Sequence, residues 1–192
     1  MYHFFAYMAR MKLIRRWSLM KSVSEENIAE HSAQVAQIAH ALALIKNRKF
    51  GGTLNADRVS TMALYHETSE VLTGDLPTPI KYYNPQIRKA YKDIEGIANE
   101  KLLSMLPEEL QEDYRALIAE EEDSYEHMLV KAADKIAAYI KCIEEMRSGN
   151  REFARAEATL RGEVERYFCH EEVKYFCDTF LDTFRKTLDE LE

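Results

Sequence analysis

The chain has 192 residues, of which 46% are hydrophobic and 31% charged, with only 6 glycines and 4 prolines. This length fits one domain with a sizeable core, and the scarcity of turn residues predicts an all-α fold. The net charge of −7 argues against a surface for polymeric nucleic acid or anionic membranes, and no apolar run is long enough to span a bilayer. We therefore expect one cytoplasmic domain over residues 1–192.

A first helix is followed by a predicted loop that carries Arg16 and Trp17. Arginine can donate two parallel hydrogen bonds to a phosphate, and tryptophan offers a rigid plate that stacks on a ligand or excludes part of it. The alternative is a buried tryptophan flanked by solvated arginines.

The next two helices carry most of the candidate functional residues. Apolar residues recur every three or four positions over residues 27–45, which predicts a helix with His31 in its buried stripe. A second helix is predicted over residues 56–71, followed by Gly74, which permits a left-handed cap. Its last turns hold His66, Glu67 and Glu70.

His66 and Glu70 are four positions apart, so a continuous helix places them on one face. A metal held by His66 would then bring Glu70 close to bound water or substrate, where a general base is needed. An ordinary surface pair of histidine and glutamate is the alternative.

The segment 75–79 contains two prolines and is predicted to form a rigid, non-helical loop, because proline removes a donor and restricts the residue before it. Cap residues and breaks place the later helices. These are expected over residues 85–105, from Pro107 to a solvated acidic run at 120–123, from the Ser124 cap to about 146, and twice between the break at 149–150 and Leu191.

Asp134 lies among small apolar residues on its helix, where a lone carboxylate is costly unless a cation compensates it. A metal would provide that charge, and so would a salt bridge to a lysine. Two imidazoles and two acids, left with open positions for water and substrate, suit a divalent first-row metal. The remaining histidines and the cysteines are expected to be structural or at the surface: His3, His40, His127, His170, Cys142, Cys169 and Cys177.

A histidine on one helix, a histidine–acid doublet on the next and a distant aspartate resemble the HD-domain phosphohydrolase superfamily. More specific stretches make the chain similar to the bacterial YfbR-like 5'-deoxynucleotidases over nearly its whole length. They include the Arg-Trp pair at 16–17, Glu-His-Ser at 30–32 and Leu-Thr-Gly-Asp-Leu-Pro-Thr-Pro at 72–79.

The resemblance implies a homodimeric HD fold that hydrolyses deoxyribonucleoside 5'-monophosphates with a divalent metal, cobalt or manganese first, and zinc or iron as other candidates. It implies that the metal ligands are His31, His66, Glu67 and Asp134. It implies that Glu70 and Asp75 act in acid–base catalysis, that Arg16 orients the phosphate, and that Trp17 disfavours a ribose 2'-hydroxyl. The nucleotide site is then expected to include Arg16, Trp17, His31, Glu67, Asp75, Leu76, Pro77, Thr78 and Asp134.

The histidine–acid doublet, His66-Glu67, departs from the family pattern at its acid. A glutamate stands where an aspartate is usual, so the carboxylate reaches one carbon–carbon bond further. This leaves two alternatives to the nucleotidase. One is a degenerate HD protein that binds a nucleotide or metal with weak or no turnover. The other is a different HD phosphohydrolase, either a phosphodiesterase or a triphosphohydrolase.

Overall fold

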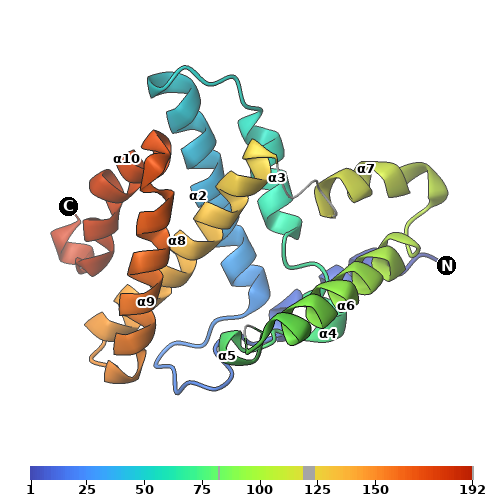
Figure 1. Cartoon of the computed structure of the whole chain (residues 1–192), viewed down its shortest axis with the longest axis horizontal. Coiled ribbons are helices and arrows are strands. Elements are labelled where there is room, and N and C mark those ends of the chain that lie inside the picture. Colours follow the sequence, from blue (N-terminus) through green and yellow to red (C-terminus); the bar gives the residue numbers. More distant parts are fainter. Residues whose placement is uncertain (82, 119–123, 192) are drawn as a thin grey trace.

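The computed structural model in Figure 1 describes residues 1–81, 83–118 and 124–191. Over these ranges the chain forms helices and loops without a β-strand, and an isolated antiparallel bridge joins Arg15 to Asn27. The predicted all-α class is therefore confirmed. No helix in these ranges is both long and apolar enough to cross a membrane. The predicted acidic run at 120–123 lies outside the described ranges.

The α-helices follow the chain in the order shown by the colours of Figure 1. They are α1 (Phe4–Met8), α2 (Ile28–Lys49), α3 (Ala56–Tyr65), α4 (Glu70–Thr73), α5 (Thr78–Lys81), α6 (Pro85–Leu103), α7 (Glu108–Ile118), α8 (Tyr125–Arg147), α9 (Ala154–Glu165) and α10 (Glu171–Phe180). Short 3-10 segments lie at Met11–Leu13, Arg151–Phe153, Arg166–Cys169, Leu181–Arg185 and Leu188–Glu190.

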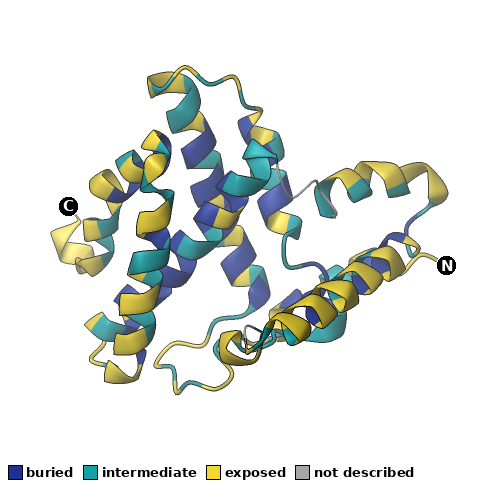
Figure 2. Cartoon of the chain, viewed as in Figure 1, coloured by how far each residue is buried: buried dark blue, intermediate teal, exposed yellow. Residues whose placement is uncertain are grey.

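Helices α2 and α8 form the centre of the molecule. Helix α2 packs against α3, α8 and α10, and α9 covers α8 from the side opposite α6 and α7 (Figure 1). Figure 2 shows buried positions along the inward faces of α2, α3 and α8. Their fully buried side chains include Val35, Leu42, Val59, Ile136 and Ile140. Removing such apolar surface from water is the main driving force of the fold.

A second, smaller core joins the N-terminal segment to α4 and α6. It contains Phe4, Ile28, Val71, Leu102 and Leu103. Ile28 opens α2, so this core lies directly beside the helix that carries His31. The two cores thus meet around the first turn of α2, and the residues between them come from several distant parts of the chain.

The predicted helix starts are confirmed by their caps. The Asn27 side chain accepts hydrogen bonds from the backbone of Ala29 and Glu30, both at 3.0 Å, and Glu30 completes a capping box. Ser124 caps α8 through a 3.0 Å bond from the backbone of His127. Helix α2 continues to Lys49, a full turn beyond the predicted end.

The single helix predicted over residues 56–71 is wrong, because the chain turns at residues 66–69 between α3 and α4. The Thr68 hydroxyl donates to the Tyr65 carbonyl at 2.6 Å, and the Glu70 backbone N–H donates to the Glu67 carbonyl at 3.1 Å. These side-chain and three-residue bonds replace the four-residue bonds of a continuous helix. His66 and Glu70 consequently do not share one helical face.

The segment 75–79 is also not wholly a loop, because Thr78 and Pro79 open the short helix α5. Proline is tolerated in the first turn of a helix, where its missing N–H would have no intrahelical partner. Gly74 ends α4 with a φ of 74°, as expected for a glycine at this position.

Candidate active site

The structure brings together the four predicted metal ligands. His31 lies in the first turn of α2, His66 directly follows α3, Glu67 is in the turn after it, and Asp134 lies in α8. Each offers one ligand atom, and these atoms lie within 4.8 Å of one another. His31 Nε2 and Asp134 Oδ1 are 2.9 Å apart, and His66 Nε2 is 3.4 Å from Glu67 Oε1. The structure therefore brings these four residues together, and they are called the four-residue cluster below. Their role as metal ligands stays a prediction.

The hydrogen bonds of His66 fit a metal ligand. Its Nδ1 lies 2.6 Å from the Ala63 carbonyl and donates to it, so in the neutral imidazole the lone pair is on Nε2. Nε2 is buried, and within the described residues it has no hydrogen-bond partner. A buried, unpaired imidazole nitrogen beside a carboxylate, with a second histidine and a second acid in reach, is a donor set that suits a divalent first-row cation.

The charges in the cluster also favour a cation. Burial raises the pKa of Asp134. The hydrogen bond with His31 and the charge of Lys135 lower it by more, so the pKa of Asp134 lies well below its usual range. Burial also raises the pKa of Glu67, but the nearby charges of His66 and Arg16 lower it by more, so this pKa too lies well below its ordinary value. Burial lowers the pKa of His66, but the Glu67 carboxylate raises it more. An imidazole whose proton affinity is raised in this way lies in negative potential.

Glu70 and Asp75 lie beside the cluster rather than in it. Glu70 is 3% exposed, and its Oε2 has no hydrogen-bond partner among the described residues. Burial, and then the negative charge of Glu67, raise the pKa of Glu70 well above its ordinary value. Burial also raises the pKa of Asp75, against the opposing charge of Arg16. A raised pKa keeps a carboxyl group protonated, which is the form that donates a proton. Which of the two residues acts as acid and which as base stays a prediction.

Arg16 reaches the cluster from the loop before α2. Its Nη1 donates to Glu67 Oε1 at 3.3 Å, and its Nε donates to Glu26 Oε2 at 3.0 Å. Burial lowers the pKa of Arg16, but the carboxylates of Glu67, Asp134 and Glu26 raise it more, so the guanidinium stays charged. A fixed cation next to a potential metal site is suited to binding a phosphate.

Trp17 is half-buried in the same loop and has a backbone φ of 58°. A residue other than glycine in this region costs about 1–3 kcal/mol, and surrounding contacts must compensate it. The indole packs on Phe153, with ring centroids 5.2 Å apart, and its Nε1 donates to Glu26 Oε2 at 2.8 Å. The predicted alternative of a tryptophan flanked by solvated arginines fits Arg15 but not Arg16, whose side chain is only 12% exposed.

Glu26 also contacts the site, although the sequence pattern does not single it out. It lies in a polar stretch just before the α2 cap, and nothing in that stretch distinguishes it from the neighbouring Glu25. Leu76, Pro77 and Thr78 follow Asp75 and are half-buried or exposed. Their part in nucleotide binding stays a prediction.

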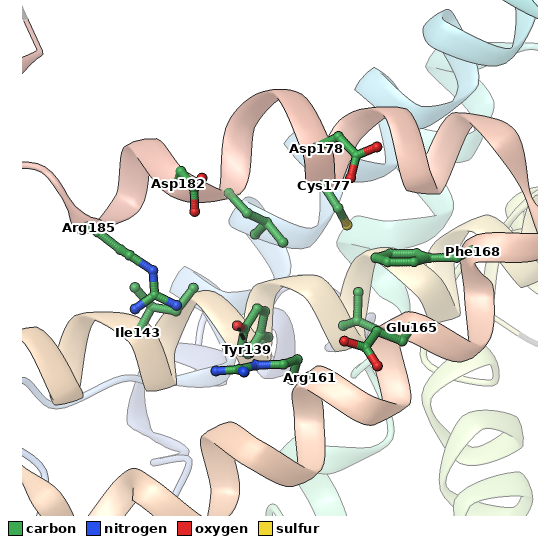
Figure 3. Close-up of a pocket in the computed structure, with 11 residues that line it drawn as sticks. Tyr139, Ile143, Arg161, Glu165, Phe168, Cys177, Asp178, Asp182 and Arg185 are labelled. Carbon is green, nitrogen blue, oxygen red and sulfur yellow. Dashed lines mark hydrogen bonds between the residues drawn. The ribbon is translucent and has the colours of Figure 1, made fainter.

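The remaining histidines and cysteines lie outside the cluster, as expected. The cysteines are free, with Cys142 and Cys177 buried and Cys169 exposed. A separate cavity of about 310 Å³ opens between α8, α9 and α10, and Figure 3 shows Arg161 and Arg185 pointing into it. All residues that line this cavity lie between Tyr139 and Arg185, so the four-residue cluster is not part of it.

Known proteins are similar to this chain in both sequence and fold. A family model described as 5'-deoxynucleotidase YfbR-like matches residues 3–184. A 5'-deoxynucleotidase of Vibrio cholerae serotype O1 is 59% identical over 194 residues, covering 98% of this chain and 97% of that protein. The crystal structure of an HD-domain phosphohydrolase from Listeria innocua has a TM-score of 0.84 at 25% identity, covering 95% of this chain and 88% of that one.

A more distant structure shows the same fold. The HD phosphohydrolase of cyanophage S-2L, bound to dA and one catalytic Zn²⁺ ion, has a TM-score of 0.68 at 18% identity, covering 93% of this chain and 96% of that one. The family match and the close relative span nearly the whole chain, and the fold around the four-residue cluster agrees with them. The chain therefore belongs to the YfbR-like 5'-deoxynucleotidase family within the HD-domain phosphohydrolases.

Proposed function

We propose that this protein is a metal-dependent 5'-deoxynucleotidase, which hydrolyses deoxyribonucleoside 5'-monophosphates to deoxyribonucleosides and phosphate. The observation that carries the proposal is the convergence of two histidines and two acids within 4.8 Å, with the Arg16 guanidinium 3.3 Å from one of those acids. The relative from Vibrio cholerae carries this activity in its name.

His31, His66, Glu67 and Asp134 would hold the divalent cation. When bound, such a cation supplies positive charge to the phosphate oxygens and makes a water molecule easier to deprotonate. We propose cobalt or manganese as the preferred metals, as the family resemblance implies, with zinc or iron as other candidates. Mixed imidazole and carboxylate donors accept all of these ions.

The protein's own side chains would carry the proton transfers and orient the substrate. Arg16 would bind the phosphate, since its buried guanidinium stays charged beside the cluster. Glu70 would take a proton from the attacking water, and Asp75 would protonate or stabilise the leaving 5'-oxygen. Trp17 would contact the sugar and exclude a 2'-hydroxyl. Leu76, Pro77 and Thr78 would complete the nucleotide site.

One observation favours a second candidate, a nucleotide- or metal-binding protein with weak turnover. The carboxylate of Glu67 contacts both His66 and Arg16, so a predicted metal ligand also partly neutralises the phosphate-binding arginine. A shorter aspartate would reach less far toward that arginine. The presence of Glu70 and Asp75, for which a binding protein has no evident need, argues for the enzyme.

The deciding experiment measures phosphate release from deoxyribo- and ribonucleoside monophosphates after the metal is stripped and each candidate metal is added back. We expect chelation to abolish activity and cobalt or manganese to restore it on deoxy substrates. Undiminished turnover by rigorously metal-free protein would refute the site as drawn. Stoichiometric metal binding without turnover on any substrate would instead favour the binding protein.

We also propose one domain over residues 1–192, a homodimer and a cytoplasmic location. Free, buried thiols at Cys142 and Cys177 support a reducing compartment. Sedimentation at several protein concentrations tests the dimer, and a single cooperative unfolding transition tests the single domain.

A further inference from the structure

We propose that Glu26 is a positioning residue that holds Arg16 and Trp17 in fixed relation to each other and thereby sets the preference for deoxyribose. This inference rests on the function proposed above. Its basis is a shared acceptor, because Glu26 Oε2 accepts from Arg16 Nε at 3.0 Å and from Trp17 Nε1 at 2.8 Å. One oxygen atom therefore links the group assigned to the phosphate with the group assigned to the sugar.

The link continues into the four-residue cluster. Arg16 is held at two nitrogens, with Nε on Glu26 and Nη1 on Glu67. The side chains of Glu26 and Arg16 are 11% and 12% exposed, so water competes little for these charge-assisted bonds. The indole is thus tied to the predicted metal ligands through two ion pairs in series.

Two contacts bear on the orientation of the indole. Phe153 packs against it at a centroid separation of 5.2 Å and an interplanar angle of 56°, and this apolar contact has no preferred donor or acceptor direction. The hydrogen bond at Nε1 fixes the ring within its own plane. A side chain can exclude one added hydroxyl by steric overlap only if it keeps its position. The preference for deoxyribose should therefore depend on the hydrogen bond between Trp17 Nε1 and Glu26.

The loop that carries these groups is anchored independently of the Glu26 side chain. The Glu145 carboxylate accepts from the backbone of Val23 at 2.9 Å and of Ser24 at 3.1 Å. The Arg16 backbone N–H donates to the Glu26 carbonyl at 2.9 Å, a bond that any residue at position 26 can accept. Substitution of Glu26 should therefore change how the two side chains are held without releasing the loop.

The test uses Glu26→Ala, Glu26→Gln and the control Glu25→Gln. Glu25 lies in the same loop, but it pairs with Arg15 at 2.9 Å with both side chains about 70% exposed. Trp17 is the only tryptophan in the chain, so quenching of tryptophan emission by acrylamide reports on this one ring without any substrate. The second readout is the ratio of kcat/KM for dAMP to that for AMP.

Glu26→Ala removes both bonds, so we expect easier quenching and a roughly tenfold fall in the dAMP-to-AMP ratio, as for a lost polar constraint. Glu26→Gln keeps an acceptor for the indole but loses the charge that faces Arg16. It should keep the ratio and the quenching and raise KM for both nucleotides. Glu25→Gln should match the wild type in all three measurements.

Unchanged quenching and an unchanged ratio in Glu26→Ala would overturn the proposal. If that variant fails to fold, Glu26→Gln decides, since a fall in kcat with KM unchanged would also overturn it. A wild-type protein that hydrolyses neither nucleotide would refute the proposed function, and the quenching measurement would still test whether Glu26 holds Trp17.

Discussion

Shortening Glu67 to aspartate is the most informative single perturbation of this site. The Glu67 carboxylate lies 3.3 Å from Arg16 Nη1 and 3.4 Å from His66 Nε2. Removal of one methylene withdraws it by about 1.5 Å, which breaks both contacts unless the backbone shifts. A hydrogen bond between charged groups contributes about 1.5–3 kcal/mol, and the long 3.3 Å distance places this one at the lower end.

A loss of about 1.5 kcal/mol corresponds to roughly a tenfold change in an equilibrium or rate constant. We expect Glu67→Asp to show similar or up to about tenfold lower kcat/KM, because the surrounding turn is packed for the longer acid. The assay is phosphate release from dAMP at matched metal content, with the metal measured in each preparation. Glu67→Gln, which keeps the length and removes the charge, is the control and should lose metal.

A rise in turnover of an order of magnitude or more in Glu67→Asp, at equal metal content, would refute this reasoning. It would mean that the pairing of Glu67 with Arg16 restrains the natural protein. The candidate with weak turnover would then be the better description.

Three further predictions address separate parts of the molecule. Glu70→Ala should keep its metal and lose about 10²- to 10⁴-fold in rate if Glu70 is the general base, whereas His31→Ala should lose the metal; equal metal loss in both, measured by elemental analysis, would make Glu70 a ligand. Trp17→Ala should narrow the gap between dAMP and AMP chiefly by improving AMP, and a strong deoxy preference that survives in steady-state kinetics would make Trp17 a packing residue. Burial raises the pKa of Glu145, but the hydrogen bond from Lys141 lowers it by more, to about 2. The contribution of Glu145 to the free energy of unfolding is therefore complete above the ordinary glutamate pKa and is lost as the pH falls toward 2. Denaturant unfolding of Glu145→Gln should therefore show a weaker loss of stability across that acid range, and an identical pH dependence in both proteins would contradict the assignment.

Sequence patterns predicted the fold wherever local chemistry determines it. Asn27 and Ser124 are good caps followed by helix-period apolar residues, and both helices begin where these signals place them. The turn after α3 could not be predicted in this way, because periodicity does not show that the Thr68 hydroxyl competes for the Tyr65 carbonyl. Ligand chemistry alone gave only a weak signal for the four-residue cluster, since its members are far apart in sequence, and the neighbouring stretches that resemble the family made it specific.

Glu26 shows the limit of prediction from one sequence. The chain contains 33 acidic residues, and Glu25 and Glu26 are chemically the same. In the loop closed by the backbone pairing of residues 15 and 27, Glu26 pairs with the buried Arg16, whereas Glu25 pairs with Arg15 at the surface. A contact of this kind is a product of tertiary structure, and local propensity does not encode it.

Helix α8 carries two residues that position different parts of the site. Asp134 lies near its middle, and Glu145, which anchors the loop before α2, follows eleven residues later, about 16 Å along the same axis. One helix thus positions both the predicted metal ligand Asp134 and the loop that carries Trp17. An insertion of a single residue between these two positions would rotate one end by about 100° relative to the other. Such a change would uncouple hydrolysis from the choice of sugar while leaving every functional side chain present.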